Sequence, residues 1–354
     1  MGKSLQMPDG PTIVVLDEIQ DCPLALAALK YFCEDMPDLH IAVAGSLFGH
    51  SLHSGVAFPV GKVDMLNIYP MSFEEFLLAM GNDMMVKVLR EKNTTVIDAI
   101  SEKYIDLLRA YYFVGGMPEA VKKYAETHEL QTVRQIQKTI LQNYRRDFSK
   151  HAPTNEVPRI NMVWDSIPSQ LARENKKFIY GAVRKGSRAA DFEIAIEWLI
   201  DAGLVYKVNR VGKPEIPLKF YEDLNAFKLF MLDIGLLGAM VDAPAAAILV
   251  GNNIFKEYKG AFTELYVHNE LRQKGKATYY YNSPNSTVEI DFLLQNETTV
   301  CPIEVKAEEN VKAKSLRTFI QNNPTLKGIR ISMKGHCDQE WMVNLPLYDF
   351  LPYM

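Results

Sequence analysis

The chain has few cysteines, no long apolar run and little net charge in its 354 residues. Cys22, Cys33, Cys301 and Cys337 lack CxxC spacing, which argues against a zinc ribbon or a disulfide framework. No apolar run reaches the roughly 20 residues of a membrane-spanning helix, so no membrane partner is expected. The net charge of -4 gives no overall attraction to nucleic acid, so such binding would need a local basic patch. These absences favour a cytoplasmic protein with reduced thiols.

Two acidic residues follow an apolar run near the start of the chain. Residues 12–16 (TIVVL) predict a buried parallel strand, and Asp17 and Glu18 stand at its carboxyl end, where ligands bind in open α/β sheets. Carboxylates at this place suit a magnesium nucleotide. Asp17 would hold Mg²⁺ through its water, and Glu18 would orient the attacking water. This is the Walker B pattern of a P-loop ATPase.

The phosphate loop that accompanies such a strand has no counterpart in this sequence. Residues 2–4 (GKS) match only the end of that motif, no strand can precede them, and residues 5–11 contain two prolines and a glycine. We therefore expect an ATPase core without its N-terminal phosphate-binding part, and weak or no ATP binding. Residues 1–80 would then form a partial parallel sheet with exposed apolar surface, which favours a homo-oligomer.

The first segment continues as alternating helix and strand. We expect a helix over 24–33, a second buried strand over 40–44 and a further strand over 61–70. Ser46 follows the second strand and is a candidate sensor of the nucleotide's γ-phosphate. A helix-capping or turn serine is an equally good interpretation of Ser46.

Helical patterns fill the region that follows. Ser72 and Glu75 form a capping box that predicts a helix over 73–80. Residues 81–152 then show helical periodicity throughout. This region resembles the helical lid that follows the core of an AAA-type ATPase.

Three short helices and a β-ribbon are expected next, in the order of a winged helix. The helices are predicted over 160–172, 179–184 and 188–202, and the alternating ribbon over 204–221. Basic residues gather ahead of the third helix and would contact nucleic-acid phosphates. A solvated surface and a protein-docking surface remain open as alternatives. The basic residues concerned are Lys176, Lys177, Arg184, Lys185 and Arg188.

Charged residues interrupt two apolar strands near the C-terminus. Asp291 lies in the strand predicted over 287–294, and Glu304 and Lys306 lie on one face of a strand over 299–307. A short turn joins the strands, so we expect a hairpin that brings Asp291 close to Glu304. Charges inside apolar strands are costly unless they are paired or bind a metal.

Glu264, on a helix predicted over 261–271, completes the residue order of a PD-(D/E)xK nuclease site. Glu264, Asp291 and Glu304 offer hard oxygen ligands for Mg²⁺. Lys306 would position or activate the water and stabilise the developing phosphorane charge. The alternative is a buried ion pair in an inert fold.

Short motifs along the whole chain carry a family resemblance: LDEIQDCP (16–23), VAGS (43–46), GKVDMLNIYPMSFEEFL (61–77), FVGGMPEAV (113–121), VWDSIPSQLARENKKF (163–178), FEIAIEWLIDAGLV (192–205), LFMLDIGLLGAM (229–240), KGAFTELYVHNEL (259–271), VEIDFLL (288–294) and PIEVKA (302–307). In this order they resemble prokaryotic AAA-superfamily ATPases that join a P-loop domain, a winged helix and a PD-(D/E)xK-like domain of unknown function. The resemblance implies ATP and Mg²⁺ as cofactors and a multidomain α/β fold. Its expected parts are a partial ATPase core (1–80), a helical lid (81–152), a winged helix (159–245) and a restriction-endonuclease-like α/β domain (250–354).

Three functions remain open on the sequence. The first is membership of that ATPase family, with nucleotide binding impaired. The second is a magnesium-dependent nuclease that acts through the C-terminal domain. The third is a scaffold without catalysis that binds nucleic acid or protein. The four charged residues of the C-terminal motif favour the nuclease over the scaffold, because an inert scaffold has no need of them.

Overall fold

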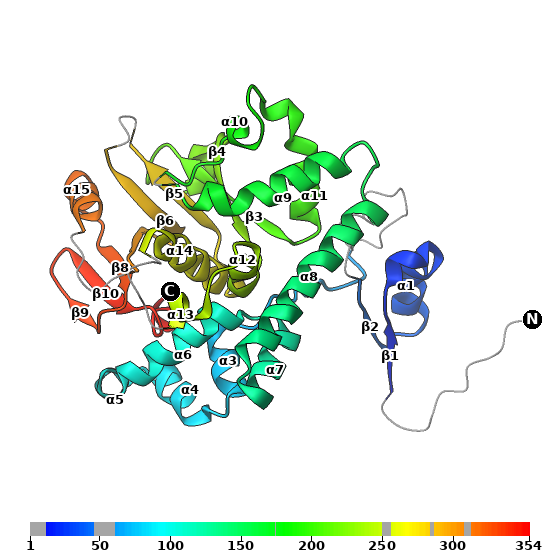
Figure 1. Cartoon of the computed structure of the whole chain (residues 1–354), viewed down its shortest axis with the longest axis horizontal. Coiled ribbons are helices and arrows are strands. Elements are labelled where there is room, and N and C mark those ends of the chain that lie inside the picture. Colours follow the sequence, from blue (N-terminus) through cyan, green and yellow to red (C-terminus); the bar gives the residue numbers. More distant parts are fainter. Residues whose placement is uncertain (1–11, 46–60, 174, 250–255, 284–286, 308–312) are drawn as a thin grey trace, which may run out of the picture.

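The computed structural model describes residues 12–45, 61–173, 175–249, 256–283, 287–307 and 313–354. In this part of the chain the strands form two sheets, a two-stranded pair near the N-terminus and an eight-stranded sheet. In Figure 1 the small pair lies at one side of the molecule, and the large sheet lies at the opposite side with helices against it.

The N-terminal unit is a parallel strand pair with one helix. β1 (Ile13–Leu16) and β2 (His40–Val43) pair in parallel, with Ile13 opposite His40. α1 (Pro23–Asp35) covers one face, and its Leu26 packs with Ile19 in a small apolar cluster. The predicted strands at 12–16 and 40–44 and the helix between them are therefore confirmed.

Two details of this unit correct the sequence prediction. The first strand was expected to be buried on both faces, but Ile13 and Val15 are 62% and 63% exposed because α1 covers only the other face. Residues 61–70 were expected to form a strand and form none. Leu66 and Ile68 are exposed there, and no described strand pairs with the segment, so apolar content alone does not make it a strand.

The next region is helical, as predicted. Its helices are α3 (Phe73–Ala79), α4 (Asp83–Arg90), α5 (Thr94–Ala99), α6 (Ser101–Val114), α7 (Pro118–Thr127) and α8 (Leu130–His151). The capping box is also confirmed. Glu75 N donates to Ser72 Oγ at 3.2 Å, and Ser72 N donates to Glu75 Oε2 at 2.7 Å. This exchange satisfies backbone donors at the start of α3.

The three short helices and the ribbon are present. They are α9 (Val157–Leu171), α10 (Tyr180–Val183), α11 (Glu193–Asp201), β3 (Val205–Val211) and β4 (Glu222–Met231). The ribbon extends beyond the predicted 204–221, because its second strand begins only at Glu222. Pro214 and Pro217 lack the N–H that a ladder needs, and a 3₁₀ turn over Leu218–Tyr221 follows them.

The ribbon is part of the C-terminal sheet. The remaining elements are α12 (Ile234–Met240), α13 (Ala245–Leu249), α14 (Lys256–Gln273), β5 (Thr278–Asn282), β6 (Glu289–Gln295), β7 (Val300–Val305), α15 (Lys314–Asn322), β8 (Gly328–Ser332), β9 (Cys337–Asp338) and β10 (Met342–Pro346). The strand order is β4-β3-β5-β6-β7-β8-β10-β9. β3 pairs in parallel with β5, which joins the ribbon to the sheet.

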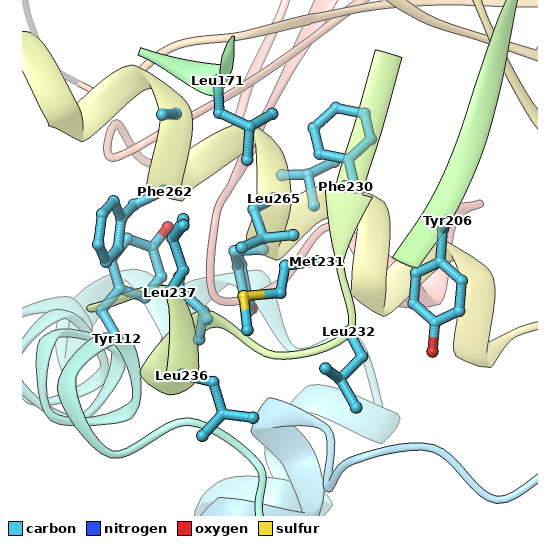
Figure 2. Packing of buried hydrophobic residues seen from close by; sticks show 14 of the residues in the cluster. Tyr112, Leu171, Tyr206, Phe230, Met231, Leu232, Leu236, Leu237, Phe262 and Leu265 are labelled. Atoms are coloured by element: carbon cyan, nitrogen blue, oxygen red, sulfur yellow. The ribbon is translucent and has the colours of Figure 1, made fainter. Parts of the chain in front are cut away.

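One hydrophobic core runs through the helical region, the ribbon and the C-terminal sheet, from Phe73 to Phe350. Figure 2 shows its centre, where Phe262 and Leu265 of α14 gather with Met231 at the end of β4 and Leu237 of α12. α14 thus lies between the helices and the sheet, where it contacts β4, β5 and β7.

A buried aspartate ties two of the sequence motifs together within this core. Asp233 Oδ2 accepts a hydrogen bond from Gly116 N at 2.7 Å, and its Oδ1 accepts one from Leu236 N at 2.8 Å. Burial raises the pKa of Asp233 to about 6, although the backbone donors of Gly116 and Leu236 oppose that rise. The motif at 113–121 is thereby joined to the start of α12.

Candidate functional site

The predicted hairpin forms and brings the two C-terminal acidic residues together. β6 and β7 pair antiparallel with Phe292 opposite Ile303, and the same register places Asp291 opposite Glu304. Asp291 Oδ2 accepts a hydrogen bond from Val305 N at 2.7 Å. The carboxylate is therefore held at the end of the ladder, between the two strands.

Lys306 and Glu264 complete the predicted group. Lys306 Nζ lies 2.9 Å from Glu304 Oε1, and Glu264 on α14 is close enough to Asp291 for its charge to raise the pKa of Asp291. Burial alone would lower the pKa of Lys306, but Glu304, Asp291 and Glu264 together raise it. All three carboxylates therefore act on one ammonium group. The structure brings together the four residues that the sequence singled out.

Two further lysines, which the sequence analysis did not assign to this site, contact the carboxylates. Lys228 of β4 is fully buried, with its Nζ 2.8 Å from Glu289 Oε1 and 3.7 Å from Glu264 Oε2. Its Nζ also lies 4.8 Å from the ring centroid of Tyr280. Lys176, on the connector between α9 and α10, pairs with Glu264 Oε1. Glu264 thus has a lysine at each oxygen.

These contacts set the ionisation of the cluster. Burial raises the pKa of Glu264, but Lys176 and Lys228 overcome it and hold the pKa below its usual value. Burial and then the charge of Glu264 raise the pKa of Asp291. Burial also raises the pKa of Glu304, against the opposing effect of Lys306. Glu264 is the carboxylate that the site keeps ionised most firmly, because opposite charges contact it from two sides.

The donor chemistry of the cluster fits a hard divalent cation. Within the described residues, the buried oxygens Glu264 Oε2 and Glu304 Oε2 receive no hydrogen bond, and carboxylate oxygens are the ligands that Mg²⁺ prefers. The described residues contain no group of three or more His, Cys, Asp or Glu side chains spaced to hold a metal ion. Carboxylate ligands are present, and Lys176 and Lys228 pair with Glu264.

The acidic pair at the N-terminal unit lies at the end of β1, as predicted. Asp17 and Glu18 are both exposed. Glu18 has φ 48° and ψ 47°, and its N–H donates to Asp17 Oδ1 at 3.0 Å. A left-handed conformation at a non-glycine residue is unusual and often marks a functional turn. Ser46, the candidate γ-phosphate sensor, lies outside the described residues, as do residues 2–4.

The basic residues of the segment predicted as a winged helix (159–245), called the winged-helix-like segment below, divide into two groups. Lys176 was expected on a nucleic-acid surface, but its side chain is only 13% exposed and pairs with Glu264. Arg184, Lys185 and Arg188 are exposed, and Lys177 is half-buried. Contact with phosphates through these four stays a prediction.

The sequence contained a signal for one of the missed lysines. Lys228 lies in the apolar run AFKLFM (226–231), and it is the same kind of charge inside a strand that drew attention to Asp291. Lys176 gave no such signal, because it belongs to a polar, basic stretch that is typical of a surface. Its partner Glu264 is 88 residues away in the chain.

Comparison with known families adds information for each part of the chain. Residues 2–77 match the family described as an AAA domain. The start of the chain is therefore similar to an AAA domain. Residues 105–247 and 259–348 match two domains of unknown function, DUF8612 and DUF4143.

Among solved structures, the chain is similar to the Walker-type ATPase PABY2304 of Pyrococcus abyssi, with 15% sequence identity and a TM-score of 0.41. The similarity covers 65% of this chain and 63% of the archaeal protein, so the chain spans less than two thirds of that protein's length. A comparison with curated proteins found no match. In the described part of the chain, no helix has the length and apolar character to cross a membrane.

Proposed function

We propose that this AAA-type protein carries a magnesium-dependent phosphodiesterase site of the PD-(D/E)xK kind in its C-terminal sheet, with nucleic acid as substrate. The observation that supports the proposal is that the carboxylates of Glu264 on α14, Asp291 on β6 and Glu304 on β7 all act on the ammonium group of Lys306, which directly follows β7. Four residues chosen from a sequence motif would not be expected to meet at one place if they only formed separate structural ion pairs.

The residues have distinct parts in this proposal. Asp291, Glu304 and Glu264 would hold Mg²⁺, which when bound polarises the scissile phosphate and lowers the pKa of a water. Lys306, whose side chain is 32% exposed, lies at the border between the buried carboxylates and solvent. Its ammonium group would orient the attacking water and stabilise the negative charge that develops on the phosphate.

Basic side chains in the same segment as Lys176 support nucleic acid as the substrate class. Arg184, Lys185 and Arg188 are exposed on the winged-helix-like segment, and the connector of that segment reaches the site through Lys176. Positive side chains bind nucleic-acid backbones without regard to sequence. In this proposal a nucleic-acid strand bound by these side chains extends along the connector toward Lys176 and the carboxylates that it contacts.

Cleavage of DNA or RNA in Mg²⁺ or Mn²⁺ tests the proposal. Asp291→Asn and Lys306→Ala should each reduce cleavage by at least about a hundredfold, as loss of a group that stabilises the transition state does. Lys327→Ala is the control and should leave cleavage unchanged. Lys327 is an exposed lysine just before β8, and it pairs with Asp338. Equal cleavage by wild type and both site variants would overturn the assignment, and circular dichroism checks that the variants are folded.

A second candidate function is nucleotide binding at the N-terminal unit. The AAA match and the exposed Asp17 and Glu18 at the end of β1 favour it. Phosphate affinity depends on backbone N–H groups and the lysine of a phosphate loop, for which the sequence offers no full motif.

We expect calorimetry with Mg-ATP to show weak or no binding. A dissociation constant in the micromolar range would contradict this expectation. Titration of the Asp17→Asn variant in parallel then decides whether the end of β1 is the binding site. A binding heat that is the same in this variant as in wild type would come from another site.

A further inference from the structure

We infer that Lys176 is an internal cation that occupies part of the divalent-metal site, so that a metal ion must displace it in order to bind. The inference deepens the proposed function, since it concerns the same carboxylates. It assigns Lys176 to the control of metal binding in the C-terminal sheet, although the residue lies in the winged-helix-like segment.

The contacts of Lys176 support this role. Its ammonium group pairs with Glu264 Oε1, and Glu264 is buried on α14, where its charge acts on Asp291. A divalent cation held by Glu264 and Asp291 would lie next to that ammonium group and be repelled by it. The two cations therefore compete for one carboxylate.

The charge balance of the cluster points the same way. Four carboxylates face three ammonium groups and the guanidinium group of Arg330, which acts on Glu304, so the cluster already has the positive charge that it needs. Removing one ammonium group would leave an excess that a divalent cation can neutralise. The groups concerned are Glu264, Glu289, Asp291, Glu304, Lys176, Lys228 and Lys306.

Lys176 is the lysine that can leave. Lys228 is fully buried, holds Glu289 as well as Glu264, and lies against the ring of Tyr280. Lys176 retains 13% exposure of its side chain on a connector at the surface. Phe178 N donates to Phe227 O at 2.7 Å and fixes the connector's backbone to β4. Rotation of the Lys176 side chain toward solvent would therefore uncover Glu264 without unfolding the connector.

Competition between Lys176 and a metal ion explains why the described residues include suitable carboxylate ligands that do not converge on one metal position. Glu264 is drawn toward Lys176 and Lys228, so its oxygens are directed to ammonium groups. Glu304 keeps a buried oxygen without a hydrogen bond among the described residues. On displacement of Lys176, Glu264 would become available beside Asp291 and Glu304.

The test is Mn²⁺ binding to the full chain, followed by electron paramagnetic resonance of the free ion. Lys176→Gln removes the charge at nearly constant size and should tighten Mn²⁺ binding by at least about tenfold, since the nearby repulsion is lost. Lys176→Arg keeps the charge and should bind Mn²⁺ as weakly as wild type. Lys177→Gln removes the neighbouring charge, which makes no contact with Glu264, and should also behave as wild type.

The outcomes separate this inference from the proposed function. Equal Mn²⁺ affinity in wild type and Lys176→Gln would overturn competition and leave the metal site standing. No binding in any variant at millimolar Mn²⁺ would overturn both. Binding that is tightened in Lys176→Gln and lost in Lys176→Gln combined with Asp291→Asn would support competition at this site, whether or not nucleic acid is cleaved. Thermal unfolding of each variant confirms that it is folded.

Discussion

Gly115→Ala should destabilise the protein by about 3 kcal/mol or more, because the added methyl group meets atoms that cannot move aside. Gly115 has φ +73°, and a Cβ at this position would lie 2.4 Å from Asp233 Oδ1 and 2.8 Å from Gly235 N. Asp233 is itself fixed by Gly116 N and Leu236 N. The junction between the end of α6 and the start of α12 would have to open.

Gly81→Ala is the matched control for this prediction. Gly81 also has a positive φ, at +72°, but a Cβ there would meet nothing within 4 Å. The control should therefore cost only the left-handed penalty of about 1–2 kcal/mol. Urea unfolding followed by circular dichroism measures both variants. Equal losses would show that the close approach to Asp233 has no energetic importance and that only the backbone conformation matters.

Local patterns predicted the parts of this fold that depend on neighbours in sequence. The capping box of Ser72 and Glu75 forms as expected, because both partners lie within one helical turn. The hairpin of β6 and β7 also forms, because a short turn and an apolar alternation fix its register. That register was sufficient to place Asp291 beside Glu304.

Pairings between distant segments were beyond the reach of these patterns. The ribbon of β3 and β4 was expected within a winged helix, and its own residues do not reveal that β3 pairs with β5. The strand predicted over 61–70 illustrates the converse. Its residues have the composition of a strand, but no described strand lies beside it to accept the hydrogen bonds.

The candidate site shows the same division. Its four motif residues could be chosen from the sequence because charges inside apolar strands and helices are costly and therefore selective. The role of Lys176 could not be predicted from the sequence, because a lysine in a basic, polar stretch resembles a surface residue until its partner is known. Only the fold places the connector at 176 against α14 and turns one member of a basic patch into a counter-ion of Glu264.

Lys228→Met should lower the free energy of unfolding by about 3–5 kcal/mol at neutral pH, the usual cost of breaking a buried ion pair by removing one partner. Methionine nearly preserves the volume of the side chain, so the loss would arise from charge and not from a cavity. Glu289 would lose its partner at 2.8 Å, and Glu264 would lose one of its two lysine partners while Lys176 stays. Lys207→Met, in β3 of the same sheet, is the control. Lys207 pairs at 3.6 Å with an exposed Glu197, and its loss should cost less than about 1 kcal/mol.

The pH dependence of this loss identifies its cause. Lys228 helps to hold the pKa of Glu264 below its usual value, so its contribution to stability is present at neutral pH and is lost as the pH falls through the folded-state pKa. The difference between wild type and Lys228→Met should therefore be largest near pH 7 and shrink toward acid, as the carboxylates left without a partner take up protons. In a double-mutant cycle, adding Glu264→Gln to Lys228→Met should cost less than Glu264→Gln alone, since the interaction between the two charges is already gone. A loss that is independent of pH, with additive mutations, would mean that Lys228 stabilises the sheet through packing on Tyr280 and not through its charge.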